Sequence, residues 1–340
     1  MYLSPFLQKS LQCIEDQPKI LKKQLSYDTN SFKTYVREHK VDRIILLGCG
    51  DSYFVAQAGE FAVRQLCPKF CTYTLEAGEF SYFSRIVTSS SLIFAISASG
   101  RTLAVKNAVK TFRERTKHIF LLTDASSTPQ PKDYQAVLST QTKGPYALPP
   151  TKTTVSAILL LFRHIFSFTN SRVAEINSAL INLPQIVDQI LRDKTLEQRL
   201  LVLTKDAKRI WLVGQGGGAI AAVAGATKIH EFGCGRSAFC QIEEFAHHGI
   251  LGVDSGDSVI LVGKGDPYTE IFADAMQKIG VSFYHLHLDE IVPKSSCREI
   301  FYPITHLIPL QKLAFNLCLA KNLNPMFFRE PHASLFKIYS

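Results

Sequence analysis

The sequence predicts an α/β protein in which two doubly wound parallel sheets follow one another along the chain. Short apolar segments that end in or near glycine alternate with amphipathic segments, which is typical of strands and helices around a parallel sheet. The same pattern occurs once in each half of the chain, which indicates that one α/β unit is repeated. The length of 340 residues, 46% of them hydrophobic, provides enough apolar surface for two domain cores.

Three short apolar segments in the first half predict strands of a buried parallel sheet. These segments are Arg43–Gly48, Leu92–Ile96 and Ile119–Leu122. Between the first and second lies Ala56–Gln65, and between the second and third lies Leu103–Arg115. Both intervening segments have apolar residues at helical spacing, so we expect each to form a helix that connects two strands.

Two further segments are helical in pattern without strands between them. Leu3–His39 has apolar residues at roughly helical spacing and predicts a helical N-terminal segment. After Leu159–Phe168 the pattern is helical and polar through Val173–Leu203. We expect this second segment to be a helical connector between the two halves.

The repeat is visible in the two best-matched pairs of apolar segments. Arg209–Gly214 matches Arg43–Gly48 at a distance of 166 positions, and Ser258–Gly263 matches Ser91–Ile96 at a distance of 167 positions. We therefore expect five parts: an N-terminal helical segment (1–40), a first α/β domain (41–170), a helical connector (171–204), a second α/β domain (205–325) and a C-terminal tail (326–340).

The formal net charge is +9, from 38 Lys and Arg against 29 Asp and Glu. A basic balance favours anionic partners such as nucleic acid, an acidic membrane surface or small phosphorylated ligands. The sequence has no run of five basic residues and no helix-turn-helix or zinc-finger pattern. We therefore expect no nucleic-acid partner, and we interpret most of the charge as a solvated surface.

The cysteines and the N-terminus indicate the compartment. Eight cysteines without paired C-x-x-C sets predict scattered reduced thiols rather than a disulfide scaffold. Met1–Lys9 lacks the features of a signal peptide, and no 18-residue stretch is both free of charge and strongly apolar. The expectation is a cytoplasmic protein with no membrane partner.

The densest group of small polar residues is Ser97–Thr102, which directly follows a predicted strand and precedes a predicted helix. At such a place the backbone N–H groups and the helix dipole favour an anion. Ser97, Ser99 and Thr102 supply hydroxyl groups, and Gly100 allows close approach of the backbone. The sequence therefore predicts a phosphate-binding loop, with a simple N-capping hydroxyl as the alternative.

Two other glycine-containing turns follow predicted strands. Gly48–Ser52 is a turn of the same kind, but Tyr53 stands where a dinucleotide fingerprint needs glycine or alanine. Gly214–Ala219 in the second half does fit the pattern G-x-G-x-x-A. A nicotinamide dinucleotide therefore remains an alternative ligand for the second half at this point.

Glu231, His247 and His248 are the strongest acid–base candidates. A carboxylate and an imidazole suit an enolisation, in which one moves a carbon-bound proton and the other a proton on an oxygen. The alternative is that the histidines are ordinary solvated side chains. Together with His230 the histidine pair fits no known metal-ligand spacing, so we expect no metal.

Several segments, in this order and spacing, resemble motifs of the sugar isomerase (SIS) domain family, from about Asp42 to Lys337. The resemblance is to the double-SIS isomerase half of glucosamine-6-phosphate synthase and to stand-alone phosphosugar isomerases, deaminases and deglycases. The segments that carry it are Gly48–Ser52 (G-C-G-T-S in the family), Glu79–Tyr82 (E-F-x-Y), Ile96–Thr102 (S-x-S-G-E-T), Pro150–Thr153 (part of S-T-K-x-x-T), Gly225–Glu231 (G-A-L-K-x-K-E), Ile308–Gln311 (I-P-L-Q) and Leu335–Lys337 (L-x-K).

The resemblance implies two tandem SIS domains and a role for each matching residue. Glu231 would move the proton between C1 and C2, His247 or His248 would assist ring opening, and Lys337 would approach the carbonyl end of the sugar from a tail that closes the active site. The substrate phosphate would be bound by Ser52, Ser97, Ser99 and Thr102. Other substrate contacts would come from Gly50, Asp51, Ala98, Gly100, Leu148, Pro150 and Lys228.

The chain departs from the family pattern at four positions. Arg101 replaces an acidic residue of the phosphate loop, and Pro150 replaces a substrate-binding serine. Asp51 replaces a threonine, which puts a negative charge near the phosphate cradle, and His230 replaces a lysine. The second repeat has Gly263–Pro267 where the first has its serines, so we expect one phosphate loop per chain.

The expected function is that of a phosphosugar isomerase or deaminase acting on a hexose or aminohexose 6-phosphate by ring opening and C1–C2 proton transfer. No cofactor is expected. The length leaves no room for a glutaminase domain, so glutamine-dependent amidotransfer is not expected. The alternatives are a non-catalytic sugar-phosphate-binding regulator and a fructosamine-6-phosphate deglycase. Because the family's histidine reaches the neighbouring subunit's site, the resemblance also implies a homodimer with composite active sites.

Overall fold

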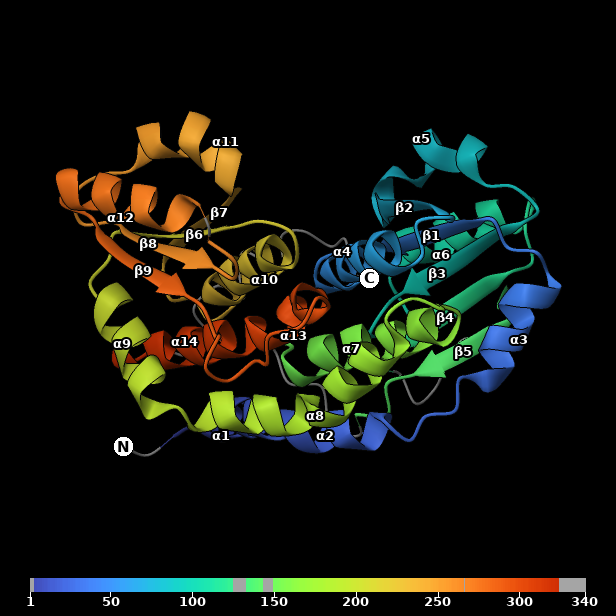
Figure 1. Cartoon of the computed structure of the whole chain (residues 1–340), viewed down its shortest axis with the longest axis horizontal. Helices are drawn as coiled ribbons and strands as arrows, with labels where there is room; N and C mark the ends of the chain where they lie inside the picture. The colour runs from blue at the N-terminus through green and yellow to red at the C-terminus, as the bar shows by residue number, and fades with distance from the viewer. Residues whose placement is uncertain (1–2, 125–132, 143–148, 266, 324–340) are drawn as a thin grey trace. The chain divides into compact units, whose positions relative to one another are not determined.

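A parallel sheet forms in each half of the chain, as the sequence predicts (Figure 1). The computed structural model describes residues 3–124, 133–142, 149–265 and 267–323. The chain divides into two units, which are described separately. The first-sheet unit consists of Lys19–Tyr146, Lys152–Ile181 and Ser334–Ser340, and the second-sheet unit consists of Met1–Pro18, Ala147–Thr151 and Asn182–Ala333.

The sheet of the first-sheet unit is parallel throughout, with strand order β2-β1-β3-β4-β5. Its strands are β1 (Arg43–Gly48), β2 (Cys71–Glu76), β3 (Ser91–Ile96), β4 (Ile119–Thr123) and β5 (Ala136–Ser139). The helices are α3 (Asn30–Glu38), α4 (Asp51–Leu66), α5 (Phe80–Phe83), α6 (Leu103–Phe112) and α7 (Lys152–Ser167), with the 3₁₀ turns η1 (Ala77–Glu79) and η2 (Ser84–Ile86); α2 (Gln17–Gln24) has residues in both units.

The sheet of the second-sheet unit is also parallel, with strand order β7-β6-β8-β9. Its strands are β6 (Arg209–Gly214), β7 (Arg236–Gln241), β8 (Ser258–Val262) and β9 (Ser282–Leu286). The helices are α1 (Pro5–Glu15), α9 (Lys194–Thr204), α10 (Gly217–Glu231), α11 (Ile242–His247), α12 (Tyr268–Lys278), α13 (Tyr302–Thr305) and α14 (Leu307–Ala320), with η4 (Gly249–Gly252) and η5 (Arg298–Phe301); α8 (Val173–Arg192) has residues in both units.

Alternate residues of each central strand pack on opposite faces of the first sheet, so both faces are apolar. On one face Ile45 and Ile93 pack with Phe112 of α6. On the other, the ring of Phe94 lies 5.6 Å from the ring of Phe32 in α3. Because both faces are covered by helices, the central strands are continuously hydrophobic, as in doubly wound sheets.

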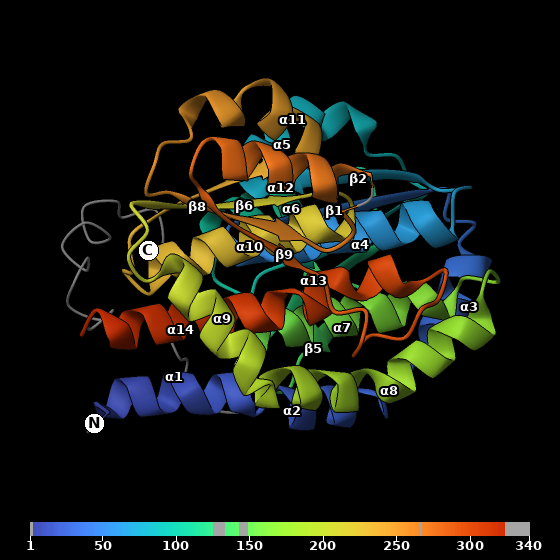
Figure 2. The same ribbon diagram turned by 60° about the vertical axis from the view of Figure 1, so that its left-hand side comes forward.

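The two units place a glycine at the same point of their first crossover helix. A Cβ on Gly59 of α4 would lie 2.6 Å from Leu46 in β1 and 2.5 Å from Leu161 in α7. A Cβ on Gly225 of α10 would lie 2.5 Å from Leu310 in α14 and would also touch β6. Helix α4 therefore packs closely on α7, and α10 on α14 (Figures 1 and 2). This shared packing confirms the repeat predicted from the sequence.

The predicted segments match the structure with small corrections. The helix predicted for Leu103–Arg115 ends at Phe112, where the last residues form a turn. The connector predicted as one helical stretch is two helices, and Asp193 caps the second by accepting a hydrogen bond from the backbone of Leu196. Strands β2, β5, β7 and β9 were not predicted. Within the described part of the chain, none of the helices is both long and apolar enough to traverse a lipid bilayer.

Candidate functional site

The turn after β3 is organised by bonds between its own hydroxyl groups. The buried Oγ of Ser97 lies 2.9 Å from Oγ1 of Thr102, and Ser99 Oγ accepts a hydrogen bond of 3.2 Å from the backbone N–H of Arg101. Gly100 has a φ of 64°, which lies in the left-handed region that glycine adopts without strain. The turn therefore holds the hydroxyls of Ser97 and Thr102 against each other, with the Ser99 hydroxyl bonded to the backbone between them.

Helix α6 begins at this turn without a side-chain cap. Thr102 occupies the N-cap position but accepts no capping hydrogen bond, and the first turn of α6 has no acidic residue. Thr102 therefore does not cap α6 with its side chain, which was the alternative role considered for these hydroxyl groups. A helix N-terminus that lacks both a cap and an acidic side chain suits an anionic ligand.

The turn after β1 lies at the same edge of the sheet. Strands β1 and β3 are parallel neighbours, and the connections from them leave in opposite directions, to β2 and to β4. This arrangement is a topological switch point, where ligands of open α/β sheets bind. Ser52 is half-buried in the first turn of α4, and its hydroxyl makes no hydrogen bond to any described residue. The sheet thus brings Ser52 to the edge that carries Ser97.

The charged departures from the family pattern have different surroundings. Thr154 of α7 donates a hydrogen bond to Oδ2 of Asp51, which also lies in the first turn of α4, where the helix dipole favours an acid. Arg101 is exposed, and no carboxylate of a described residue lies within 4.0 Å of its guanidinium group. Arg101 therefore adds an uncompensated positive charge beside the turn.

Ala98, another predicted substrate contact, has a structural role. Its carbonyl accepts hydrogen bonds from the hydroxyl of Thr123 and from the backbone N–H of Asp124.

In the second-sheet unit the candidate base Glu231 forms an ion pair with Lys228. Nζ of Lys228 lies 2.6 Å from Oε2 of Glu231, one helical turn away on α10. The lysine side chain is fully buried, whereas the glutamate side chain is 34% exposed. Lys228 therefore contacts the candidate base and can hold it in place.

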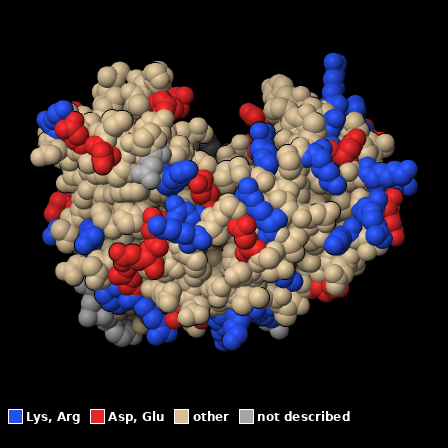
Figure 3. Space-filling view, in the orientation of Figure 1, with Lys and Arg blue, Asp and Glu red and all other residues tan. Residues whose placement is uncertain are grey.

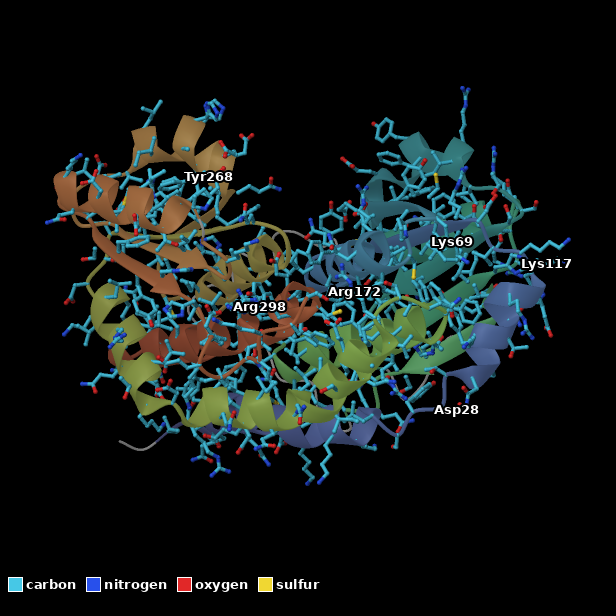
Figure 4. All side chains as sticks on the ribbon, viewed as in Figure 1. Asp28, Lys69, Lys117, Arg172, Tyr268 and Arg298 are labelled. Carbon is cyan, nitrogen blue, oxygen red and sulfur yellow. The ribbon has the colours of Figure 1, made fainter. Side chains whose placement is uncertain are left out.

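Both candidate histidines lie on the surface of the second-sheet unit. His247 ends α11 and is exposed, and Nε2 of His248 lies 3.9 Å from Oε2 of Glu244 with 78% of its side chain exposed. On the same helix, Glu243 accepts a hydrogen bond from Tyr268, which is labelled in Figure 4. Both rings are therefore exposed, and Glu244 is the carboxylate next to His248.

His230, which stands where the family has a lysine, has a structural role. Its Nε2 accepts a hydrogen bond of 3.1 Å from the backbone N–H of Ser237, and the hydroxyl of Ser237 donates to the carbonyl of Ala226. Both bonds join α10 to β7. His230 is therefore part of the connection that fixes the end of α10, next to Glu231.

The glycine-rich turn of the second sheet is covered by the chain itself. A Cβ on Gly217 would lie 2.1 Å from the carbonyl oxygen of Glu299 and 3.1 Å from Cβ of Tyr302. The neighbouring Arg298, labelled in Figure 4, is bound to Asp289 at 2.9 Å. The glycines of this turn make room for the chain, so the pattern G-x-G-x-x-A no longer supports a nicotinamide ligand here.

The remaining predicted site residues give less information. Pro150 is half-buried just before α7. Leu148 and Lys337 lie outside the described residues.

The residues that the structure describes contain no group of three or more His, Cys, Asp or Glu side chains that could hold a metal ion. The bond from Thr154 to Asp51 was not foreseen, because no local sequence signal joins residues 103 positions apart.

Comparison with known proteins identifies the fold. The SIS domain model matches residues 39–163. A glutamine–fructose-6-phosphate aminotransferase (isomerizing) of Pyrococcus horikoshii is 24% identical over 332 residues, which cover 93% of this chain and 55% of that protein. The chain thus spans about half the length of the curated relatives it matches.

Solved structures share the fold over nearly the whole chain. The C-terminal domain of glucosamine-fructose-6-phosphate aminotransferase from Francisella tularensis has a TM-score of 0.78 at 18% identity, with 93% of this chain and 96% of that chain covered. Glucosamine-6-phosphate deaminase from Thermotoga maritima has a TM-score of 0.71 at 18% identity, with 95% and 98% covered. Residues 39–163 therefore match the SIS domain, and nearly the whole chain shares the fold, with two parallel sheets in tandem, of the C-terminal domain of the aminotransferase and of the deaminase.

Proposed function

We propose that the protein is a phosphosugar isomerase or deaminase that acts on a hexose or aminohexose 6-phosphate. The observation that carries this proposal is the turn after β3, where Ser97, Ser99 and Thr102 surround the uncapped N-terminus of α6. Ser52 lies at the same edge of the sheet. Hydroxyl donors, backbone N–H groups and a helix dipole together favour a phosphate group.

Phosphate binding in this proposal involves both turns and Arg101. The one proton that joins the Ser97 and Thr102 hydroxyls turns toward the phosphate, so that both hydroxyls donate to phosphate oxygens, and Ser52 donates a further hydrogen bond. The exposed guanidinium of Arg101 adds a positive charge, which stabilises a dianionic phosphate through charge-assisted hydrogen bonds. The carboxylate of Asp51, which would otherwise repel the phosphate, already accepts a hydrogen bond from Thr154.

The proton chemistry is assigned to Glu231 and to one of the two histidines. The protonated histidine gives a proton to the ring oxygen as the ring C–O bond breaks, and the neutral imidazole then takes up the proton of the anomeric hydroxyl. The Glu231 carboxylate takes the proton from C2 of the open aldose or from C1 of the ketose. The same carboxyl group protonates the resulting enediol or enolamine on the neighbouring carbon, while a proton moves between the oxygens on C1 and C2 of an enediol. The imine formed from an enolamine is hydrolysed by water, which releases ammonia. Lys228 holds the carboxylate in one orientation during both steps.

The sugar class rests on the resemblance. The aminotransferase relative has fructose 6-phosphate in its name, and the deaminase of similar fold has glucosamine 6-phosphate in its name. Both sugars carry the phosphate at the end opposite to the reacting C1 and C2. A site that combines a phosphate loop with an acid–base pair fits either substrate, and the reaction outcome then depends on whether C2 carries a hydroxyl or an amine.

A substrate panel tests the proposal. The purified protein is incubated with fructose, glucose, mannose, glucosamine and fructosamine 6-phosphates, and products and ammonia are measured by chromatography and by a coupled assay. We expect turnover of at least one member, loss of turnover in Glu231→Gln with binding retained, and weaker binding in Ser97→Ala. The matched control variants are Glu270→Gln and Ser89→Ala, which alter exposed residues and should leave both properties unchanged.

A regulatory sugar-phosphate-binding protein is the second candidate, because Pro150 provides no hydroxyl group where the family has a substrate-binding serine. Binding of one panel member without turnover of any would favour this candidate. Release of an amine from fructosamine 6-phosphate alone would instead identify a deglycase. If no member of the panel is bound and none is turned over, both proposals are refuted.

A further inference from the structure

A cavity of about 450 Å³ in the first-sheet unit lies at the opposite end of the strands from the candidate phosphate loop. Its lining includes Val41, just before β1, and Phe70, just before β2. The turns that carry Ser52 and Ser97 follow the other ends of β1 and β3. A six-residue strand spans roughly 20 Å, so the cavity is separate from the candidate phosphate loop.

The cavity is surrounded by positive charge. Lys33, Arg37 and Lys40 line it from one side, at helical spacing along α3 and its C-terminal end, and Lys69 lines it from the loop before β2. The lining contains no acidic residue. No carboxylate of a described residue lies within 4.0 Å of any of these four cations. Figure 3 shows Lys and Arg side chains at the α3 edge, with acidic side chains beside them, and Figure 4 labels Lys69.

The dipole of helix α3 explains only part of this clustering of positively charged side chains. Cations near a helix C-terminus are favoured by the dipole, which accounts for Arg37 and Lys40 at the end of α3. Lys33 lies one turn before Arg37, where a second like charge is destabilising. Lys69 belongs to a different element and adds a fourth charge. Four like charges from two elements, none with a carboxylate of a described residue within 4.0 Å, favour an anionic ligand.

The rest of the lining can bind a larger anion. Phe70 and Phe168 form the apolar part of the cavity with their rings 5.4 Å apart, and Nζ of Lys69 lies 5.0 Å from the centre of the Phe70 ring. Thr34 and Asn170 provide neutral hydrogen-bonding groups at the cavity. Four cations around one cavity exceed what a single phosphate needs, because a phosphate monoester carries at most two negative charges.

We propose that this cavity is a binding site for a small polyphosphate anion, distinct from the sugar-phosphate site and independent of the proposed function. Arg37 binds one phosphoryl group through its planar guanidinium, and the three lysines neutralise the others as point charges. The ligand is either an inorganic polyphosphate or the polyphosphate part of a nucleotide whose base contacts the aromatic side chains.

Isothermal titration calorimetry of the full chain with inorganic tripolyphosphate, ATP and inorganic phosphate tests this proposal. We expect tripolyphosphate and ATP to bind at least about tenfold more tightly than phosphate, since each additional charge-assisted contact contributes about tenfold. Tighter binding of ATP than of tripolyphosphate would support a nucleotide ligand, and equal binding would support recognition of the phosphates alone.

Variants from two separate elements locate the site. Lys33→Gln/Arg37→Gln on α3 and Lys69→Gln before β2 should each weaken tripolyphosphate binding by about tenfold or more. Lys19→Gln/Lys23→Gln removes the same i,i+4 pair of exposed charges from α2 and should bind as the wild type does.

Four results would overturn the proposal. They are absence of binding, equal loss in the α2 control variant, loss of polyphosphate binding in Ser97→Ala, and binding of a single-stranded oligonucleotide without binding of either small polyanion. Because Ser97→Ala is the variant that weakens sugar-phosphate binding, the two proposals fail independently of each other.

Discussion

The buried ammonium group of Lys228 lies 2.6 Å from the partly exposed carboxylate of Glu231, one turn further along α10. A buried charge is stable only when it is paired, so the lysine depends on the glutamate for part of its stabilisation. In return, the carboxylate is held in one orientation at the end of the helix. The pair therefore links the stability of the second-sheet unit to the geometry of the candidate base.

Substitution of Glu231 tests the effect of this pair on stability, and substitution of Lys228 tests its effect on activity. Glu231→Gln should lower the free energy of unfolding by about 1–3 kcal/mol, because it leaves a buried ammonium without its carboxylate. Lys228→Met should lower turnover about 10- to 100-fold through misplacement of the base, with little change in substrate affinity. Urea unfolding and steady-state kinetics measure the two effects.

The double variant Lys228→Met/Glu231→Gln provides the control for this coupling. Because it removes both charges, it should be more stable than Glu231→Gln alone. Strictly additive losses of stability in the double variant would mean that the two side chains are not coupled. Unchanged turnover in Lys228→Met would refute the positioning role.

Gly50 and Gly216 have almost the same backbone conformation, with φ and ψ of 55° and −127° in the first and 54° and −129° in the second. Alanine at either position should be strained by about 1–3 kcal/mol, because side chains rarely adopt this conformation. A Cβ on Gly50 has no atom within 4 Å, so the effect there is one of backbone strain alone.

The two variants should differ in ligand binding. Gly50→Ala should raise the Kd for a sugar phosphate, because it displaces the turn that carries Ser52, whereas Gly216→Ala should leave this Kd unchanged. Gly252→Ala is the matched control, since its Cβ would meet the nearest atom at 3.7 Å and its φ is not positive. Thermal unfolding and calorimetry measure both properties. Equal changes of Kd in the first two variants would contradict the assignment of the phosphate to the first sheet.

Two buried histidines should make the protein sensitive to acid. Burial lowers the pKa of His306 to about 3 and that of His164 to about 4, whereas both have ordinary values near 6.5 when the chain is unfolded. Between these values the unfolded state binds more protons than the folded state. Stability should therefore fall as the pH decreases from about 6.5, by up to about 1.4 kcal/mol per pH unit for each histidine.

Unfolding free energies between pH 7.5 and 4.5 test this dependence. His306→Asn keeps an amide near Thr305, which lies 3.1 Å from Nδ1 of the histidine, and should flatten the decrease of stability on acidification. His248→Asn changes an exposed ring and should keep the wild-type slope. An identical slope in His306→Asn and the wild type would show that His306 is not charged on unfolding.

The sequence predicted the central strands of both sheets and none of the edge strands. Strands β1, β3 and β8 are buried on both faces and therefore consist almost entirely of apolar residues. Strands β2 and β7 lie at sheet edges, are partly exposed, and contain polar residues throughout. Their pairing depends on the neighbouring strand rather than on their own composition, so no local pattern indicates them.

In the candidate site too, the features that depend on residues close in sequence were predictable, whereas those that depend on residues far apart in sequence were not. The group Ser97–Thr102 was recognisable because its hydroxyls lie within six residues at a strand end. The pairing of Lys228 with Glu231 follows from their helical spacing, but the complete burial of the lysine depends on how α10 packs. The covering of the glycine-rich turn after β6 by Tyr302 was not predictable, since Gly217 and Tyr302 are 85 positions apart in the sequence.

The exposure of His247 and His248 leads to a prediction about assembly. The SIS resemblance implies that a histidine acts in the site of a neighbouring subunit, and both rings are exposed at the C-terminal end of α11. We propose a homodimer whose sites combine Glu231 of one protomer with a histidine of the other, which is also the commonest oligomer type. The variant Glu231→Gln and the variant His247→Ala/His248→Ala should each be inactive alone.

Mixing the two inactive variants after reversible dissociation should restore activity. In a mixed dimer one site contains both substitutions and the other contains neither, so a random mixture should recover roughly a quarter of the wild-type activity if protomers exchange freely. If Glu231 and the histidine act within one chain, every site in the mixture carries one lesion and no activity returns. Sedimentation velocity at the assay concentration provides the independent measurement, and a monomeric active enzyme would refute the composite site.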